Sequence, residues 1–464
     1  MNTQDTICAI ATAQGGAIGV IRISGKDAIA ITDRIFTPVG KHPLPLSERK
    51  AYTMAFGHIR QDDGEIIDEV LIGLFKSPHS YTGEDCVEIS CHGSSFILQQ
   101  VMQLLIRKGC RAAGPGEFTQ RAFLNGKMDL SQAEAVADLI ASSSAATHRM
   151  AMNQMRGGFS RELSALRERL LHLTSLMELE LDFSDHEELE FADRSELETI
   201  AGDIEKVISG LVHSFSVGNV LKNGIPVAIV GETNAGKSTL LNTLLNEEKA
   251  IVSDIHGTTR DVIEDTVNLS GITFRFIDTA GIRDTHDTIE NMGIARSFHK
   301  MEQAEIVLWV VDNTCAEAQI RQLSPRILPL CSNKQLIMLL NKSDQVSAVP
   351  TKLSGLPENT VTLSISAKEK TGIQELQNLL VKTASVPELT SSDLIVTNVR
   401  HYEALSLALE DIHRVQNGLQ THLSGDFISQ DLRECLFHLA EIVGGEITAD
   451  EVLGNIFMKF CIGK

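Results

Sequence analysis

The sequence predicts a multidomain protein of the α/β and α classes, in which a nucleotide-binding domain with a doubly wound sheet is inserted into a helical bundle. Three observations predict it. The segment Gly231–Ser238 fits the phosphate-loop pattern G-x-x-x-x-G-K-[ST]. Strand and helix patterns alternate around this loop, and helical patterns lie on both sides of the alternating region. We expect an α+β domain at 1–118, the first part of the helical domain at 119–217, the inserted domain at 218–384 and the second helical part at 385–464.

Composition limits the functions that the chain can have. Its 464 residues suffice for two to four domains, and 43% of them are hydrophobic. No stretch reaches the roughly 20 apolar residues of a membrane span, so we expect no membrane contact and a cytoplasmic location. The formal net charge of −20 excludes a broad basic face, so any nucleic acid must meet a local patch or a partner protein.

Cysteine spacing argues against disulfide and zinc frameworks. The chain has eight cysteines and no C-x-x-C pair, so we expect reduced thiols that are mostly buried. They stand at Cys8, Cys86, Cys91, Cys110, Cys315, Cys331, Cys435 and Cys461.

The first domain mixes strand and helix patterns. Short apolar or alternating segments predict strands, and longer amphipathic segments predict helices. Gly114-Pro-Gly116 then closes the domain as a breaker cluster. The expected strands are Thr6–Ile10, Gly19–Ser24, Val70–Phe75 and Cys86–Ser90, and the expected helices are Ala28–Ile35 and Ser95–Ile106.

The following segment has helical periodicity. Ser131-Gln-Ala-Glu134 has the form of a capping box before the helix Ala135–Ile140. The acidic stretch Asp182–Glu190 predicts a solvated turn between helices, with metal binding as the alternative. Apolar residues recur three and four apart, as in a bundle seam, at Leu163, Leu166, Leu170, Leu173 and Met177.

The phosphate loop stands between the strand-type run Val227–Val230 and the helix start Thr239–Leu245. Gly231 and Gly236 let the backbone curl so that several N–H groups face one anion. The Lys237 ammonium would reach the outer phosphates, and the Ser238 hydroxyl would bind Mg²⁺.

Further loops follow strand-type runs and complete the nucleotide site. Gly257-Thr-Thr259-Arg-Asp261 supplies a threonine for the metal, and Asp278-Thr-Ala-Gly281 follows Ile272–Ile277. Asn341-Lys-Ser-Asp344 follows Leu336–Leu340, and Ser366-Ala367 follows another run. The Asp344 carboxylate can accept from the N1 and N2 donors of guanine, a pair that adenine lacks, so the expected nucleotide is GTP.

The end of the chain returns to helical pattern. Leu394–Gly418 and Ile428–Val443 predict helices, and Gly444-Gly445 ends the second one. Thr448-x-x-Glu451 predicts a last short helix before the terminal Cys461-Ile-Gly-Lys464. A nucleotide switch in the inserted domain could therefore act on the bundle through both of its connections.

The residue that orients the attacking water is not fixed by spacing. Ile282 stands where well-known small GTPases have a glutamine, and its side chain cannot orient water. The acidic candidates nearby are Asp284, Asp287 and Glu290, and each could equally be an exposed charge of a switch segment.

These motifs together resemble the MnmE (TrmE) family of tRNA uridine modification GTPases. The resemblance covers essentially the whole chain. Glu232-Thr233 departs from it, since arginine and proline are common at these tolerant positions. The motifs that carry it are the phosphate loop with Asn234, Gly257–Asp261, Asp278–Arg283 and Cys461–Lys464, with Tyr81–Asp85, Pro115–Phe118 and Arg121–Asn125 in the first third.

The resemblance implies a K⁺ ion beside the phosphates, held by Asn234 and by Ser253, Ile255 and Thr258, with Mg²⁺ on Ser238 and Thr259. It selects Glu290 as the water-orienting residue, which we count as catalytic together with Lys237. The implied nucleotide contacts are Asn234, Ala235, Gly236, Lys237, Ser238, Thr239, Ser253, Asp254, Ile255, His256, Gly257, Thr258, Thr259, Asp278, Thr279, Ala280, Gly281, Asn341, Lys342, Asp344, Ser366 and Ala367.

The resemblance also implies that the first domain has a folate-binding fold, forms a homodimer and holds a 5-formyltetrahydrofolate-type donor. The matching positions are Arg22, Glu88, Lys127 and the terminal Lys464. A guanidinium can pair with the folate carboxylate, and Glu88 can accept from pterin N–H groups. Cys461 stays open as either a thiol catalyst or a passive thiol, because no base stands near it in the sequence.

The implied activity is K⁺-dependent GTP hydrolysis that opens and closes the inserted domain. With a FAD-dependent MnmG (GidA) partner, it would install a carboxymethylaminomethyl-type group at C5 of the wobble uridine (position 34) of certain tRNAs. The alternative is a ribosome-assembly GTPase that binds rRNA. Such switches usually add a basic module after the nucleotide domain, and the segment after 384 is helical and not notably basic.

Overall fold

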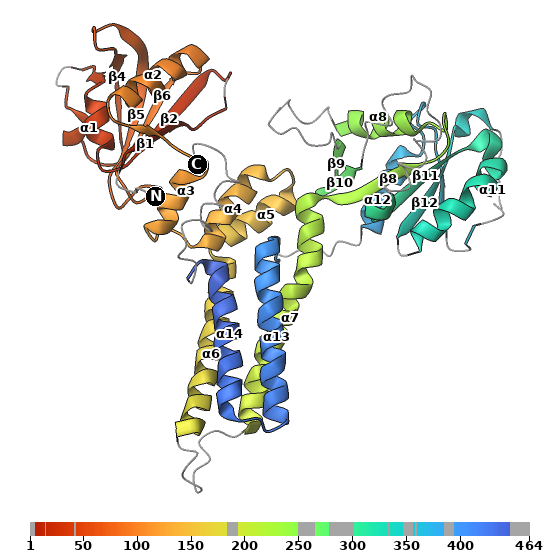
Figure 1. Cartoon of the computed structure of the whole chain (residues 1–464). Coiled ribbons are helices and arrows are strands. Elements are labelled where there is room, and N and C mark those ends of the chain that lie inside the picture. The colour runs from red at the N-terminus through yellow and green to blue at the C-terminus, as the bar shows by residue number, and fades with distance from the viewer. Residues whose placement is uncertain are drawn as a thin grey trace. The chain divides into compact units, whose positions relative to one another are not determined.

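The computed structural model (Figure 1) describes residues 5–13, 15–40, 43–182, 194–248, 265–277, 301–332, 334–346, 356–357, 360–384 and 394–445. They fall into two compact units. The first takes in most residues before Gly210 and those from Glu403 onward, and the second takes in Gly210–Tyr402 with Ser142–Met150. None of the described helices is long and apolar enough to cross a membrane.

The first unit begins with a seven-stranded sheet in the order β3-β4-β5-β6-β2-β1-β7. Neighbouring strands are antiparallel except β1 and β7. The sequence patterns predicted β1, β2, β5 and β6 and missed the other three. The strands are β1 Ile7–Ile10, β2 Ile18–Ser24, β3 Phe36–Pro38, β4 Thr53–Arg60, β5 Ile66–Phe75, β6 Cys86–His92 and β7 Arg111–Ala112.

Helices cover both faces of this sheet. Successive residues of a strand face opposite sides, so Cys8 packs in one core while Ile7 and Ala9 pack in another. The Cys8 side carries α1 (Ala28–Asp33) and α2 (Ser95–Arg107), with the single turn η1 Leu46–Glu48 beside α1. The other side carries Phe118 of α3 (Glu117–Leu124) against Ile7 and Ala9.

Four long helices form the bundle, as Figure 1 shows. The predicted seam is confirmed: its five apolar residues from Leu163 to Met177 are at most 2% exposed. Helices α4 Leu130–Ala141 and α5 Ala145–Met155 precede them along the chain. The bundle helices are α6 Gly158–Asp182, α7 Arg194–Asn223, α13 Val399–Gln420 and α14 Gly425–Val443.

The predicted capping box before α4 is wrong by two residues. Asp129 caps the helix, because its Oδ1 accepts from the Gln132 N–H at 2.9 Å and its own N–H donates to Gln132 Oε1 at 2.9 Å. Ser131 instead donates its hydroxyl hydrogen to Asp129. The earlier start buries Leu130 completely, and a Cβ on Gly444 would lie 3.0 Å from the Leu130 Cβ.

The second unit holds a six-stranded sheet in the order β13-β12-β11-β8-β10-β9, parallel except for β9. This confirms the doubly wound α/β class. The central β8 has β10 on one side and β11 on the other, so the winding reverses at β8. The strands are β8 Ile225–Val230, β9 Asp265–Leu269, β10 Ile272–Phe276, β11 Ile306–Asp312, β12 Gln335–Asn341 and β13 Val361–Ser364.

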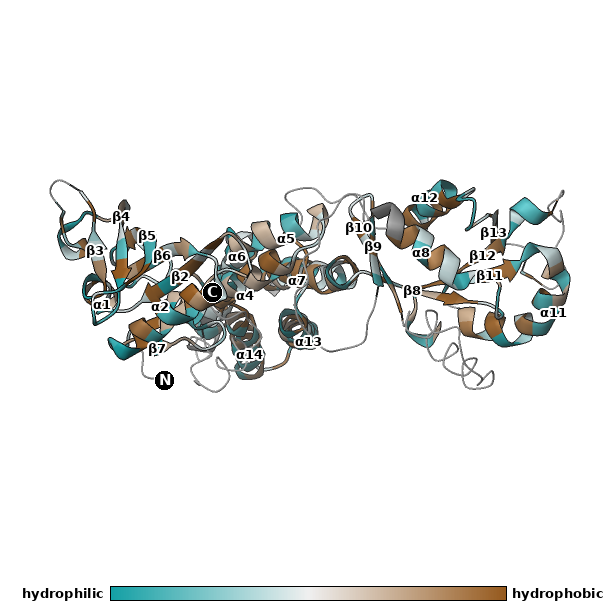
Figure 2. Ribbon diagram, turned by 90° about the horizontal axis from the view of Figure 1, so that it is seen from above, coloured by the Kyte–Doolittle hydropathy of each residue, from teal (hydrophilic) through white to brown (hydrophobic). Residues whose placement is uncertain are grey.

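Helices enclose the second sheet on both faces. Figure 2 shows its hydrophobic strands between helices that carry both kinds of residue. Helices α8 (Lys237–Glu248) and α12 (Ile373–Thr383) share one core with the sheet, and α11 (Ala316–Ile327) shares the other. Short 3-10 turns lie at η2 Asn313–Cys315, η3 Leu328–Cys331 and η4 Ser343–Gln345.

The chain enters and leaves the second unit at neighbouring points. Ser214 and Gly218 belong to α7, so the expected boundary at 218 falls inside this helix, which continues to Asn223. The Val396 N–H donates to Ser214 Oγ at 3.0 Å, and a Cβ on Gly218 would lie 2.1 Å from the Val396 carbonyl oxygen. The Phe215 and Tyr402 rings stack with centroids 4.4 Å apart.

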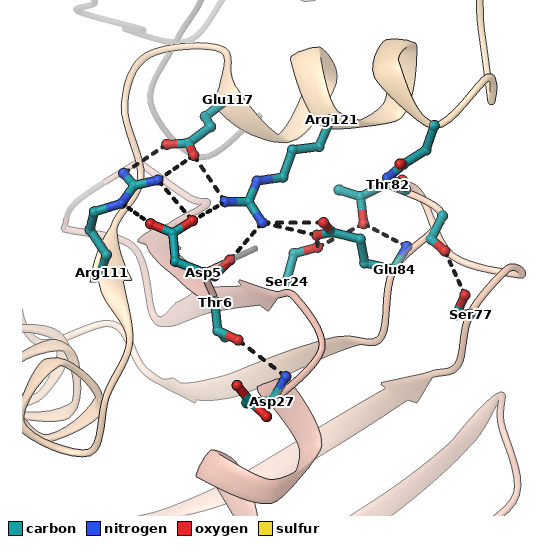
Figure 3. A network of polar contacts seen from close by, with 12 residues as sticks. Asp5, Thr6, Ser24, Asp27, Ser77, Thr82, Glu84, Arg111, Glu117 and Arg121 are labelled. Atoms are coloured by element: carbon teal, nitrogen blue, oxygen red, sulfur yellow. Dashed lines mark hydrogen bonds and ion pairs between the residues drawn. The ribbon is translucent and has the colours of Figure 1, made fainter. Parts of the chain in front are cut away.

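An ion-pair cluster joins the start of β1 to β7 and α3 (Figure 3). Arg121 Nη2 donates to Asp5 Oδ1 at 2.8 Å and to Glu117 Oε1 at 3.1 Å. Arg111 donates to the same two carboxylates. Hydrogen bonds from Arg111 hold the pKa of Asp5 below its usual value. Burial acts to raise the pKa of Glu117, but hydrogen bonds from Arg111, the Gly114 N–H and Arg121 outweigh it and lower the pKa.

The cluster predicts a pH-dependent stability. A carboxylate whose pKa is depressed on folding stabilises the fold above its unfolded pKa of about 4, and this stabilisation is lost as the pH falls through the folded pKa. Glu117→Gln should therefore lower the unfolding free energy of the first domain by about 2 kcal/mol at pH 7, since it leaves the buried Arg121 guanidinium incompletely paired. The difference in unfolding free energy between the variant and the wild type should become smaller below about pH 4, where Glu117 of the wild type begins to take up a proton.

Hydrogen exchange of α3 peptides in the full chain, followed across this pH range, measures the effect. Glu69→Gln is the matched control, because the Glu69 side chain is 63% exposed and pairs only loosely with His58 at 3.3 Å. A cost of Glu117→Gln that stays constant from pH 7 to pH 3 would contradict the assignment.

Candidate active site

The phosphate loop follows β8 and has the backbone that its glycines permit. Gly231 has φ +148°, and a Cβ there would lie 2.1 Å from the Val310 carbonyl oxygen. Gly236 has φ +99°, and a Cβ there would lie 2.1 Å from Asn341 Nδ2. Asn234 lies between them at φ +64°. Helix α8 then begins at Lys237, so its N-terminal N–H groups border the loop.

Lys237 lies within the loop itself. Its Nζ donates to the Gly231 carbonyl oxygen at 2.8 Å and to that of Glu232 at 2.7 Å. Burial lowers the pKa of Lys237, and the charge of Glu232 acts in the opposite direction. A phosphate in the loop would be a stronger partner than a carbonyl and would raise this pKa again. Ser238 and Thr239 occupy the first turn of α8.

Asn341 joins three of the predicted loops. Its Nδ2 donates to the Ala235 carbonyl oxygen at 2.8 Å, and its Oδ1 accepts from the Ala367 N–H at 3.0 Å. The Thr243 hydroxyl of α8 donates to the Ala367 carbonyl oxygen at 3.0 Å. Asn341 is 3% exposed. The phosphate loop and the two loops expected at the base therefore hold one another by direct hydrogen bonds.

The residues expected at the guanine base are also fixed by contacts. Ser366 Oγ donates to Asp344 Oδ1 at 2.6 Å, which orients this carboxylate. Lys342 takes a left-handed backbone at φ +63°, and its Nζ donates to Asp312 Oδ2 at 2.5 Å. An oriented carboxylate that accepts two hydrogen bonds suits the N1 and N2 donors of guanine.

Asp312 also belongs to the base side of the site, because it holds the Lys342 side chain, and the sequence motifs did not predict it. It is 9% exposed, and burial acts to raise its pKa, but hydrogen bonds from Lys342 and Thr314 lower the pKa below its usual value. The sequence could have indicated Asp312, since it is a carboxylate at the end of an apolar strand-type run. That strand, β11, lies next to β8, which leads into the phosphate loop.

Part of the predicted site lies outside the described residues and stays a prediction. This part comprises both switch segments with the proposed K⁺ loop and water-orienting residue, and the end of the chain. The residues concerned are Ser253, Asp254, Ile255, His256, Gly257, Thr258, Thr259, Asp278, Thr279, Ala280, Gly281, Asp284, Asp287, Glu290, Cys461 and Lys464.

The first domain brings together two of its predicted site residues. Arg22 and Glu88 are directly opposite on β2 and β6, and both Nε and Nη2 of Arg22 bond to Glu88 Oε1, at 2.9 and 2.8 Å. The Arg22 guanidinium carbon lies 5.5 Å from the Tyr81 ring centroid and 5.8 Å from that of Phe118. Lys127 is exposed, and its Nζ donates to the Pro78 carbonyl oxygen at 3.0 Å.

Gly236→Ala tests the loop geometry. The added methyl group would clash with the Asn341 amide, so displacement of the loop should weaken GTP binding by about 100-fold or more. Gly271→Ala is the matched control, since Gly271 also has a positive φ of +84° but nothing lies within 4 Å of its added Cβ. Titration with a fluorescent guanine nucleotide measures both, and equal affinities would contradict a phosphate-binding role for this loop.

Two family models together match nearly the whole chain, and a solved structure matches part of it. The family model described as MnmE helical domain matches residues 130–461, and that described as GTP-binding protein TrmE N-terminus matches residues 6–127. A solved structure of Era from Aquifex aeolicus bound to GDP·AlF4⁻ is 28% identical over 40% of this chain and 66% of that chain, with a TM-score of 0.27.

Full-length relatives agree with the family models. A tRNA modification GTPase MnmE of Bacteroides thetaiotaomicron is 67% identical over 99% of this chain and 100% of its own length. A protein of the same name from Flavobacterium johnsoniae is 52% identical over 100% of both chains. The chain therefore belongs to the MnmE (TrmE) family of tRNA modification GTPases.

Proposed function

We propose that this chain is a K⁺-dependent, Mg²⁺-dependent GTP hydrolase that works with a FAD-dependent MnmG (GidA) partner. Together they install a carboxymethylaminomethyl-type group at C5 of the wobble uridine (position 34) of certain tRNAs, and hydrolysis opens and closes the inserted domain. The observation that carries the GTPase part is the double hydrogen bond of Asn341, which joins the phosphate loop to the base-side loop. Relatives that match at full length and are named tRNA modification GTPases support the remainder.

The roles at the phosphates follow from residue chemistry. Lys237 and the N–H groups of the loop bind the triphosphate, and the hydroxyls of Ser238 and Thr259 bind Mg²⁺. Glu290 orients the attacking water. A K⁺ ion held beside the phosphates would supply positive charge where negative charge develops on the transferred phosphoryl group. Its ligands are Asn234 in the phosphate loop and Ser253, Ile255 and Thr258 in the first switch.

The first domain would hold the one-carbon donor, a 5-formyltetrahydrofolate-type folate. Arg22 and Glu88 bond to each other, so both would meet the pterin end of the folate: Glu88 would accept from the pterin N–H groups, and Arg22 would donate to the pterin carbonyl oxygen or ring nitrogens. Lys127 and Lys464 add positive charge. The present Arg22 and Glu88 pair supports this assignment, since it places a cation and an acceptor side by side against two aromatic rings.

The same face of the first sheet supports a homodimer. Met54, Phe56 and Leu71 are 65%, 47% and 44% exposed, and the strand register places them on the face of Arg22 and Glu88. Exposed large apolar side chains on one sheet face favour association with another protein surface. A second copy seated there would cover the apolar side chains and enclose the folate residues.

Modification assays with the purified full chain and its flavin partner test the function. Wobble uridine modification should require GTP and fail with a non-hydrolysable analogue. Glu290→Ala should leave GTP affinity near normal and cut turnover by about 100-fold, as loss of a water-orienting group would, and modification should fall with it. Full modification by this variant would overturn the proposal. Intact tRNA together with defective rRNA processing in a deletion strain would favour the ribosome-assembly alternative.

The cation dependence is a separate prediction. Replacing K⁺ by Na⁺ at constant ionic strength should slow GTP hydrolysis, because Na⁺ is too small for a site formed by carbonyl and amide oxygens spaced for K⁺. Phosphate release measures the rate. Asn234→Ala should remove the difference between the two salts by removing one ligand, and equal wild-type rates in both salts would exclude K⁺ from the mechanism.

A further inference from the structure

Arg121 connects three separate segments of the first domain (Figure 3). It lies on α3, and its side chain is 3% exposed. Its Nη1 donates to the Asp5 carbonyl oxygen at 2.8 Å and to the two Glu84 carboxylate oxygens at 3.2 and 3.3 Å. Its Nη2 donates to the carboxylates of Asp5 and Glu117, as described above. One buried guanidinium therefore holds the start of β1, α3 and the loop before β6.

Glu84 carries this connection to the strand of Arg22. Glu84 Oε2 accepts from Ser24 Oγ at 2.7 Å, and the Ser24 and Thr82 hydroxyls lie 2.7 Å apart. Ser24 stands two residues after Arg22 on β2, so the two side chains share one face of the sheet. Arg121 is thus connected, through the Glu84 carboxylate and the Ser24 hydroxyl, to the sheet face that carries Arg22.

The loop of residues 77–85, which contains Glu84, is joined at three further points to α3 and to the segment that follows it. The Tyr81 and Thr119 hydroxyls lie 2.9 Å apart. Asn125 Nδ2 donates to the Thr82 carbonyl oxygen at 2.7 Å, and Lys127 Nζ donates to the Pro78 carbonyl oxygen at 3.0 Å. These three contacts hold the Tyr81 and Phe118 rings beside Arg22, and they also hold Lys127 in place.

Arg111 provides a natural comparison, because it bonds to two of the same carboxylates. It pairs with Asp5 and Glu117, but its side chain is 47% exposed and the contacts described for it do not include Glu84. Both arginines therefore stabilise the ion-pair cluster through Asp5 and Glu117. The connection to the loop belongs to Arg121.

We propose that Arg121 is a positioning residue for the one-carbon donor site: it holds the 77–85 loop on α3 and thereby sets the placement of Arg22, Tyr81 and Lys127. This inference rests on the proposed folate role of Arg22, Glu88 and Lys127. Arg121 acts through Glu84 and the loop. A planar guanidinium that serves several acceptors has no equivalent in lysine, which offers a single ammonium, so a lysine at this position should restore only part of the function.

The test is the affinity of the full-length chain for 5-formyltetrahydrofolate, measured by calorimetry well below the melting temperature. Arg121→Gln should weaken binding about tenfold or more, and Arg121→Lys should recover part of the loss. Glu84→Gln should also weaken binding, although Arg121 keeps Asp5 and Glu117. Arg111→Lys, the matched control, should stay within about twofold of wild type because its ion pairs are half exposed.

Kinetics separate positioning from stability. In the modification assay, Arg121→Lys should raise the KM for the folate with a much smaller change in kcat, since a misplaced binding group removes binding common to ground and transition states. A loss of stability alone would instead reduce the amount of active protein and leave KM unchanged. Equal losses of affinity in Arg111→Lys and Arg121→Lys would overturn the proposal.

Glu84→Gln carries the test if Arg121→Gln does not fold, and wild-type affinity in Glu84→Gln would overturn the inference. Arg22→Ala separates the inference from the proposed function. If wild type binds the folate and Arg22→Ala loses affinity while Arg121→Gln and Glu84→Gln keep it, only the positioning role fails. If the wild type itself does not bind, the proposed folate function fails and this inference fails with it.

Discussion

The amide group of Asn341 is the constraint on which the nucleotide site depends. One planar group donates to the phosphate loop at Ala235 and accepts from Ala367, so its two bonds fix the separation of loops that follow different strands. The ladders from β8 through β11 and β12 to β13 set the same separation independently. Loss of the amide would leave two buried backbone groups without partners, at about 1–3 kcal/mol each. The sheet and this one side chain therefore locate the site together.

In the first domain, charged side chains rather than a neutral amide hold separate segments of the chain together. Arg121 and Arg111 face the carboxylates of Asp5, Glu84 and Glu117, and of the two arginines Arg121 is buried while Arg111 is half exposed. Buried ion pairs contribute little net stability, because desolvation offsets their attraction, but a broken pair is costly. Such a cluster therefore disfavours arrangements of α3 and its loop that break these ion pairs.

Local patterns predicted the parts of this molecule that local physics determines. The glycines of the phosphate loop, the bundle seam and the alternation of strands and helices each need only neighbours in sequence. The capping error at Asp129 shows the limit, since Asp129 with Gln132 fits the same local rule as Ser131 with Glu134, and the rule does not say which of the two forms. Contacts such as Arg121 to Asp5, 116 positions apart, have no local signal. The pairing of Lys342 with Asp312 likewise depends on strand order.

The contact between Ser214 and Val396 bears on how such a chain could arise. Because the departing and returning segments are already neighbours, a linker of a few residues could replace everything between them, and closing so short a loop costs little entropy. The bundle helices outside this point would keep the partners that they have within the first unit. The architecture is therefore compatible with acquisition of the α/β module in a single genetic event by an ancestral helical protein that folded without it.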